Sequence, residues 1–529
     1  MISKLMHKRA LTPTWLHFLI VILLVLGVFF RFVNLDRKVF WIDENYTSLR
    51  ISGHTEAEFI QLVFDGHIVN LNELQKYQQP NHEKGLFSTI NSLAVESPQH
   101  PPLYYVMARF WLQWWGTSAA AIRSLSALLS LLLFPCAYWL CLELFKSSLT
   151  GWIAIALIAV SPFHILYAQE AREYSLWSVT IALSSAALLH AIRLKTMLSW
   201  AIYAASVALG LYTFIFSVFV IIGHTAYIVI MERCRLTKTC LSYSLAMIAA
   251  LLAFSPWIII VLNNLSRVQS TAAWTELKLP FGRLLQGWII HLSCVFFDLN
   301  TGYKYLRPPS LVLLVLVAYS IYFLLRKTPK DVWLFVLTLI GASALALVLP
   351  DLIFGGMRSI QARYLIPCYL GVQLAVAYLL AAKIVSFKNR QQQIWQLIFI
   401  VILTGSIVSC AVSSQAEFWW NKSPDKHKYN SQIASIVNST VRPLLISDDS
   451  TLISDSFACR ILALSYLLNP KVQLQLVLGP NIPKIPDGFS DVFLFSPSEA
   501  LRLSIEKQAY KAELVFQRDN FWFWKLSNY

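Results

Sequence analysis

Charged residues are scarce in this chain of 529 residues, at 13%, whereas hydrophobic residues make up 57%. Soluble globular chains carry roughly 25% charged residues, so a water-soluble fold is disfavoured. The net charge is +15, but no basic stripe interleaved with aromatics and no nucleic-acid-binding motif is present. The basic residues stand in short segments between apolar runs, which points to lipid and away from nucleic acid as a partner.

Cysteine pairs of the metal-binding kind are also missing. The eight cysteines include no CxxC pair, and most fall inside or beside apolar segments. We therefore expect neither a disulfide framework nor a structural zinc site. The sequence also contains no internal repeat and no low-complexity linker.

What the chain does contain is a succession of apolar runs of about 17 to 24 residues, each long enough to cross a bilayer as a helix. The first follows Lys4, Lys8 and Arg9 and precedes no small-residue cleavage site, so we expect an uncleaved signal anchor. The predicted spans are 13–33, 121–144, 150–168, 174–192, 197–212, 214–231, 242–262, 308–325, 332–350, 363–384 and 393–412.

A shorter aromatic run, Pro102 to Trp115, decides the orientation of everything after it. If this run lies in the membrane interface, the basic clusters all face the cytoplasm, as the positive-inside rule requires. These clusters are Lys4/Lys8/Arg9, Lys146, Arg193/Lys195, Arg233/Arg235/Lys238, Arg326/Lys327/Lys330 and Lys383/Lys388/Arg390. We therefore predict an interfacial helix here and about 11 transmembrane helices in total.

This orientation sends the first loop (34–120) and the tail to the outer face of the cell (inner) membrane. After Ser413 the composition changes, and strand-like runs alternate with helical stretches, which predicts a small extracytoplasmic α/β domain over 413–529. The expected strands are Leu444–Ser447, Val472–Leu478, Val492–Phe495 and Phe521–Leu526, and the expected helices are Ser431–Val437, Ser454–Leu468 and Pro497–Gln508. The predicted fold is mainly α, a multi-pass helical membrane domain (1–412, including the first outer loop) followed by this domain.

Two motifs in the first outer loop contain groups that could react or bind. Asp43 and Glu44 follow the first span, and a carboxylate near an apolar surface could have a raised pKa and act as a base. Alternatively, Asp43 caps an interfacial helix and Glu44 lies in its first turn. His100 precedes two prolines, where it could bind a metal or a phosphate, or be merely hydrogen-bonded.

Two further motifs lie at predicted outer ends of helices. Glu170, Arg172 and Glu173 combine carboxylates with a guanidinium suited to phosphate, although an internal Glu–Arg pair is equally possible. Arg358 and Arg363 stand beside Gly355 and Gly356, as in an anion cradle, or else anchor the helix start by snorkelling. The predicted topology sends all four motifs to one face.

Taken together, the motifs resemble those of the GT-C glycosyltransferases. Asp-Glu after the first helix, His-Pro-Pro-Leu-Tyr-Tyr before a short helix, and Gln-Glu-Ala-Arg-x-Tyr-Ser-Leu are most similar to the family 39-like dolichyl-phosphate-mannose–protein mannosyltransferases and their bacterial relatives. The resemblance covers about residues 10–412 and implies inverting transfer of a mannose-like hexose or a pentose from a polyprenyl-phosphate donor. The acceptor would be a protein, lipid or polysaccharide of the cell envelope.

The resemblance also implies roles for individual residues. Asp43 would be the general base, and Glu44 would support it or bind the acceptor. Glu170 matches the second acidic position. The donor phosphate would be bound by Arg172, Arg358, Arg363 and His100, while a divalent metal, if one is used, would draw on Asp43, Glu170 and His100.

One departure separates the chain from a related branch. The aminoarabinose transferases that modify lipid A have Glu-Lys-Pro where this chain has Gln99-His100-Pro101. The substitution removes a possible carboxylate ligand, which argues against a tightly bound metal and a lipid A acceptor. It favours the mannosyltransferase-like branch.

The alternative from another class is a polytopic transporter, or a lipid-handling membrane protein without transferase activity. Transporters place ionisable groups near the bilayer midplane. The central turns of the predicted spans contain no Asp, Glu, Lys or Arg, and only His224 comes near the middle of one. We therefore favour the interpretation as a glycosyltransferase over that as a transporter.

Overall fold

The structure of the chain is a computed structural model with two compact units. It describes residues 14–81, 83–300, 308–384, 390–422, 427–449, 457–479, 481–508, 510–518 and 521–528. Lys4, Lys8, Arg9, Lys388 and the start of the predicted helix 454–468 lie outside the described residues. Unit 1 comprises Met1–Leu35, Ser97–Tyr104 and Arg123–Gln415, and unit 2 comprises Asp36–Glu96, Tyr105–Ile122 and Ala416–Tyr529.

Unit 1 is built from helices, and α7 and α8 contribute residues to both units. Its elements are α2 (Thr14–Phe32), α8 (Ala119–Leu131), α9 (Leu133–Phe145), α10 (Ser148–Ala159), α11 (Pro162–Ala168), α12 (Tyr174–Leu194), α13 (Met197–Thr213), α14 (Ser217–Met231), α15 (Lys238–Asn263), α16 (Leu265–Ala272), η1 (Ala273–Glu276), α17 (Phe281–Cys294), α18 (Pro308–Lys327), α19 (Lys330–Ile353), η2 (Arg358–Ile360), η3 (Ala362–Leu365), α20 (Ile366–Ile384) and α21 (Arg390–Gln415).

The helices confirm a multi-span membrane protein. Within the described residues, eight helical segments are long and apolar enough to cross a bilayer, and the pair α10/α11 makes a ninth if it is one broken span. Two shorter apolar helices, α13 and α14, coincide with the two remaining predicted spans. The predicted interfacial run forms α7 (Leu103–Trp115), a helix of 13 residues.

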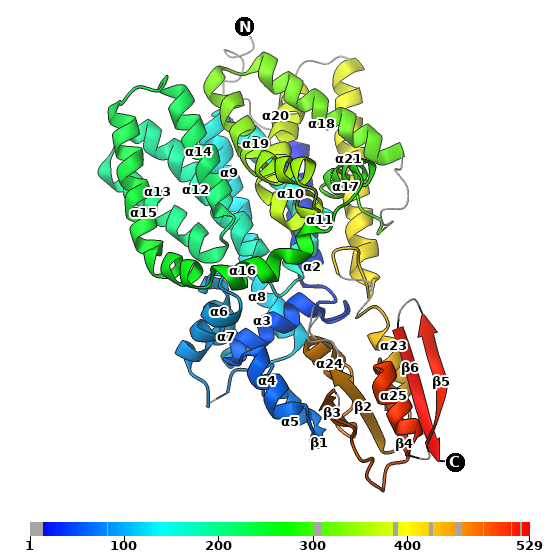
Figure 1. Cartoon of the computed structure of the whole chain (residues 1–529). Helices are drawn as coiled ribbons and strands as arrows, with labels where there is room; N and C mark the ends of the chain where they lie inside the picture. The colour runs from blue at the N-terminus through cyan, green and yellow to red at the C-terminus, as the bar shows by residue number, and fades with distance from the viewer. Residues whose placement is uncertain are drawn as a thin grey trace. The chain divides into compact units, whose positions relative to one another are not determined.

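Helix α20 occupies the interior of unit 1. It packs against α10, α12, α18, α19 and α21, and several of these surround it in Figure 1. Its sequence is apolar on every side, as expected of a helix that is buried all round.

A close contact between α2 and α10 explains why the predicted span 150–168 is broken. A Cβ on Gly27 would lie 2.6 Å from the Ala159 carbonyl oxygen, so only glycine permits this approach. Arg31 donates to the carbonyls of Ala159 (2.6 Å) and Ile158 (3.2 Å), which end α10. Pro162 starts α11 after a bend of 60°, and Arg31 satisfies carbonyls that the bend leaves without helical partners.

Unit 2 is an α/β structure drawn from both ends of the chain. Its elements are α3 (Ile42–Ser52), α4 (Glu56–Val63), β1 (Asp65–Asn70), α5 (Leu71–Gln75), α6 (Leu86–Glu96), α7, α23 (Asn430–Asn438), β2 (Pro443–Asp449), α24 (Phe457–Ser465), β3 (Gln473–Leu478), β4 (Asp491–Phe495), α25 (Glu499–Glu506), β5 (Tyr510–Arg518) and β6 (Phe521–Asn528).

The six strands form one sheet in the order β1-β3-β2-β4-β6-β5. Strands β3, β2 and β4 are parallel, and β1, β6 and β5 are added antiparallel. The four predicted strands are present as β2, β3, β4 and β6, which confirms the small α/β fold. Two strands, β1 and β5, were not predicted.

Strand β1 brings the first loop into the C-terminal sheet, and in Figure 1 it lies in blue beside the brown β3. One apolar core joins the two segments, since Leu49, Phe59 and Val63 are clustered with Ile461 and Leu474. The predicted division at residue 412 separates these segments, whereas the shared sheet and core join most of the loop to the tail. The physical reason is that neither segment can bury its apolar face alone.

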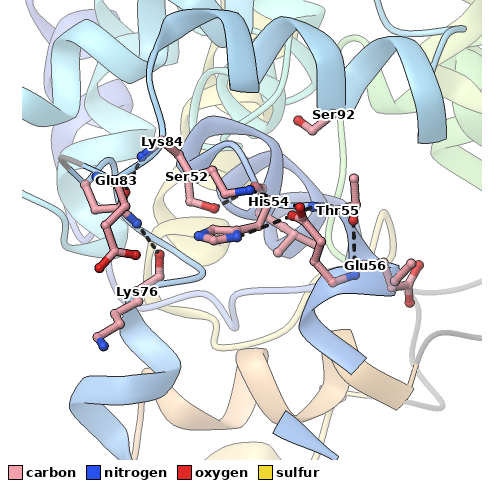
Figure 2. A network of polar contacts seen from close by, with 12 residues as sticks. Ser52, His54, Thr55, Glu56, Lys76, Glu83, Lys84 and Ser92 are labelled. Atoms are coloured by element: carbon pink, nitrogen blue, oxygen red, sulfur yellow. Dashed lines mark hydrogen bonds and ion pairs between the residues drawn. The ribbon is translucent and has the colours of Figure 1, made fainter. Parts of the chain in front are cut away.

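A polar network holds the start of α4 and the loop before α6 together (Figure 2). The Thr55 hydroxyl accepts from the Glu58 amide (3.1 Å), and the Glu58 carboxylate accepts from the Thr55 amide (3.0 Å), which is a capping box. Lys84 donates to the same carboxylate at 2.9 Å. His54 lies in this network with its ring 4.8 Å from that of Tyr77.

Candidate functional site

The turn between α11 and α12 carries one of the predicted motifs and is tied to the end of α2. The Gln169 side chain donates to the carbonyls of Phe30 (2.8 Å) and Val33 (2.9 Å). The Arg172 amide donates to the Glu170 carbonyl at 2.7 Å, which tightens the turn. The side chains of Glu170 and Arg172 are both buried, so the charged groups of this turn are shielded from solvent.

The centre of the site is the His100–Arg172–Glu173 cluster. His100 Nδ1 is hydrogen-bonded to Glu173 Oε1 at 2.8 Å, and Arg172 Nη2 lies 3.3 Å from the same oxygen. Arg172 Nη2 also lies 3.2 Å from His100 Nε2. The backbone before His100 is held by Trp257, whose indole N–H donates to the Pro98 carbonyl at 3.0 Å. The structure thus brings together two predicted phosphate-binding residues from segments far apart in the chain.

Glu173 supplies the negative charge of this cluster. Its side chain is fully buried, and burial alone would raise the pKa of the carboxyl. The charge of Arg172, together with the charge and hydrogen bond of His100, outweighs burial and lowers the pKa of Glu173 to about 2. Glu173 therefore stays ionised at neutral pH and orients its two basic neighbours rather than exchanging a proton.

Arg363 is connected to the His100–Arg172–Glu173 cluster through contacts with aromatic rings. Its guanidinium lies 5.9 Å from the ring centre of Tyr174, 5.3 Å from that of Tyr364 and 5.8 Å from that of Trp274. The guanidinium of Arg172 lies 5.7 Å from the ring centre of Tyr174 as well. Two arginines on one tyrosine ring form a cationic surface with aromatic backing, an arrangement suited to an anion.

Phe214 connects the two halves of this surface. Its ring is stacked with that of His100 (6.2 Å) and that of Tyr364 (6.2 Å), and meets the ring of Tyr174 edge-on at 5.8 Å. The segment after α13 thereby supports both the His100–Arg172–Glu173 cluster and Arg363. No motif in the sequence marked Phe214.

Glu170 is buried, with 1% of its surface exposed. It and Arg363 are both near enough to Tyr167 to act on its hydroxyl electrostatically. The predicted internal Glu–Arg pair is present in the motif, where Arg172 and Glu173 form an ion pair at 3.3 Å.

Arg358 is already engaged with acidic residues. It lies 3.1 Å from Glu276 and 3.3 Å from Asp351, and it also donates to the Gly355 carbonyl at 3.2 Å. A Cβ on Gly356 would lie 2.4 Å from both Arg358 and Asp351, so the glycine lets this loop close. Arg358 therefore stabilises the loop between α19 and η3. Of the two predicted arginines Arg358 and Arg363, Arg363 is the one that contacts aromatic rings in the cluster.

Asp43 and Glu44 both lie in the first turn of α3, in unit 2. The N-cap residue is Trp41, so Asp43 is not the cap, and its side chain is partly exposed. The Glu44 carboxylate is fully buried, accepts from the Trp41 amide at 3.4 Å and is paired with Lys422 at 3.1 Å. The two adjacent carboxylates therefore have different environments.

The possible metal ligands do not fit a metal site within unit 1. Both ring nitrogens of His100 lie within 3.3 Å of the Arg172 guanidinium, which would repel a cation bound to the imidazole. Asp43 belongs to unit 2, whereas His100 and Glu170 belong to unit 1. Across the described residues, no group of three or more His, Cys, Asp or Glu side chains could hold a metal ion.

Comparison with known proteins agrees with the resemblance noted in the sequence. A family model described as dolichyl-phosphate-mannose-protein mannosyltransferase matches residues 99–260. This segment contains His100, Glu170, Arg172, Glu173 and Phe214. None of the curated proteins matches the chain.

Solved structures extend the likeness to the whole chain. ArnT from Cupriavidus metallidurans bound to undecaprenyl phosphate has a TM-score of 0.55 and 10% identity, over 97% of this chain and 98% of that chain. The same protein in the apo state gives 0.53 and 11%, over 97% of both chains. An oligosaccharyltransferase of Archaeoglobus fulgidus gives 0.47 and 13%, over 87% of this chain and 64% of that one. The two ArnT matches confirm the predicted GT-C fold.

Proposed function

We propose that the chain is a glycosyltransferase that moves a mannose-like hexose or a pentose from a polyprenyl-phosphate donor to an acceptor hydroxyl at the outer face of the cytoplasmic membrane. The acceptor would be part of a protein, a lipid or a polysaccharide. The GT-C fold and the mannosyltransferase family match over 99–260 support this class. The single observation that carries the proposal is the His100–Arg172–Glu173 cluster, which shares an aromatic surface with Arg363.

This arrangement suits the phosphate of a lipid-linked sugar. Arg172 and Arg363 offer guanidinium groups to phosphate oxygens, and Glu173 keeps Arg172 and His100 oriented. When the bond between the sugar and the phosphate breaks, negative charge develops on the phosphate oxygens. Preorganised cations stabilise that charge most where water is excluded, and Arg172 and Glu173 are both buried.

Asp43 would act as the general base. In an inverting transfer the base takes the proton of the acceptor hydroxyl, and the resulting oxygen attacks the anomeric carbon from the face opposite the phosphate. The bond from the anomeric carbon to the phosphate oxygen breaks, and its electron pair leaves with polyprenyl phosphate. One base and one stabilised leaving group suffice, without a pair of carboxylates spaced for a covalent intermediate. The partly exposed side chain of Asp43 and the buried, paired side chain of Glu44 favour Asp43 for this role.

A transfer assay with purified protein tests the proposal. Polyprenyl-phosphate sugars labelled in the sugar are incubated with membrane extracts that supply the acceptor, and labelled product and released polyprenyl phosphate are measured. We expect turnover by the wild type and none by Asp43→Asn, which should insert and fold normally. The matched control is Asp36→Asn, an exposed carboxylate in the same loop, which should react like the wild type. Absence of wild-type turnover with every donor tried, or full turnover by Asp43→Asn, would contradict the proposal.

A further inference from the structure

The segment that follows α21 is built into the start of α3. The Val39 amide donates to the Glu417 carbonyl at 2.9 Å, which joins the two segments through the backbone. Trp419 is 2% exposed, and its carbonyl accepts from the Lys422 amide at 3.1 Å. Residues about 380 positions apart in the sequence therefore form one local structure within unit 2.

Lys422 ends this segment with its charge fully buried. Its Nζ lies 3.1 Å from the Glu44 carboxylate, and the two side chains are 1% and 0% exposed. Nζ also lies 5.4 Å from the ring centre of Trp41, the N-cap residue of α3. The same Glu44 oxygen accepts from the Trp41 amide, so Lys422 holds the carboxylate that closes the first helical turn.

The C-terminal region contacts α3 and the residues before it in a second place. The ring of Tyr466 packs 4.4 Å from that of Phe40, and the Tyr466 hydroxyl lies 3.5 Å from that of Ser48. Helix α24 packs along α3, and Leu49 belongs to the apolar core of the sheet. The helix that carries Asp43 is thus held by the tail at its start and along its length.

A buried ion pair is a poor way to gain stability, because desolvation of both charges offsets their attraction. Replacing such a pair by apolar residues of similar volume is often neutral or stabilising, so stability alone does not account for Lys422 and Glu44. The Glu44 carboxylate is paired with Lys422 and also accepts from the Trp41 amide, and these directional contacts restrict the helix start to one geometry. A non-directional apolar contact would restrict it less.

We propose that Lys422 is a positioning residue for the transfer reaction: through Glu44 it fixes the first turn of α3 and so the direction of Asp43. This inference rests on the proposed function. It makes the tail from residue 416 a part of the catalytic apparatus, although no residue of the tail needs to touch the substrate.

The test compares kcat and the donor KM of purified variants in the transfer assay. We expect Lys422→Met to lower kcat about 10- to 100-fold, since small misplacements of a reacting group cost this much. The donor KM should change less than about threefold, because donor binding depends on other residues. Lys422→Arg, which keeps the charge, should recover most of kcat, and Lys525→Met, which removes an exposed lysine paired with Asp491 in the same unit, should match the wild type.

A double variant separates positioning from loss of folding and from an independent role. If Lys422 acts through Glu44, then adding Lys422→Met to Glu44→Gln should lower kcat by less than about twofold, because coupled residues are not additive. The double variant removes both charges of the Lys422–Glu44 ion pair together, so it stays informative even if Lys422→Met alone folds poorly. Full multiplication of the two effects, or wild-type kcat in Lys422→Met, would overturn the positioning role while a working wild type leaves the proposed function intact. A wild type without transfer activity would overturn both.

Discussion

Replacing Glu173 by glutamine is the most informative single change in unit 1. The substitution keeps the shape of the side chain and an acceptor oxygen, but it removes the negative charge that Glu173 contributes to the His100–Arg172–Glu173 cluster. Glu173 is fully buried, 2.8 Å from His100 and 3.3 Å from Arg172. Both basic groups would then have to be held by a neutral amide.

The size of the effect follows from these contacts. Hydrogen bonds to charged groups contribute about 1.5–3 kcal/mol, and a buried charge that loses its partner costs about 3–5 kcal/mol. Glutamine still accepts one hydrogen bond, so we expect the free energy of unfolding to fall by about 2–3 kcal/mol.

Two measurements check this prediction. In detergent, the melting temperature of Glu173→Gln should fall by several degrees, whereas Glu232→Gln, a partly exposed carboxylate elsewhere in unit 1, should not change it. In the transfer assay, the donor KM should rise about tenfold, because Arg172 and His100 lose their orientation toward the phosphate. A variant with the melting temperature and KM of the wild type would refute the role assigned to Glu173.

Three further predictions concern other parts of the chain. Arg363→Met should raise the donor KM about tenfold and Arg363→Lys nearly as much, because a lysine does not reproduce the planar contacts with Tyr174 and Tyr364; equal KM values in titrations of all three proteins would contradict this. Gly27→Ala should lower the melting temperature by overpacking α2 against Ala159, at a cost of about 1–3 kcal/mol, whereas Gly282→Ala, which meets open space, should not. His54 has its pKa lowered below 6.5 by burial first and then by Lys84, so its neutral form stabilises unit 2 above that pH, and the benefit is lost as the pH falls through the folded-state pKa. Melting curves between about pH 7.5 and 5.5 should therefore be flatter for His54→Gln than for the wild type, and identical slopes would exclude the effect.

The helical part of the fold could be read from the sequence because lipid imposes long apolar runs, and every predicted span has a helix in the described residues. The break between α10 and α11 was missed, because it depends on Arg31 reaching carbonyls 127 and 128 residues away. Strand β1 was also missed. Its sequence, DGHIVN, has little strand preference of its own, and its partner β3 is some 400 residues further along the chain.

The site could be predicted only in part, for a similar reason. Residue type and motif order singled out His100, Arg172 and Arg363, which the structure places on one aromatic surface. The role of Glu173 was not predicted, because its contacts with His100 and Arg172 depend on the local geometry of the turn. Lys422 gave no signal at all, because a single lysine in a polar segment looks like solvated surface until its partner Glu44 is located.

Equilibrium binding of the lipid carrier tests most directly whether the cationic surface of unit 1 is a site for polyprenyl phosphate. Native mass spectrometry of the purified chain can compare polyprenyl phosphate with the corresponding alcohol, which has the same tail and no phosphate. We expect the wild type to retain the phosphate at least about tenfold more tightly than the alcohol, and Arg172→Met with Arg363→Met to abolish that preference. Equal retention of both lipids by the wild type, or an unchanged preference in the double variant, would contradict the account.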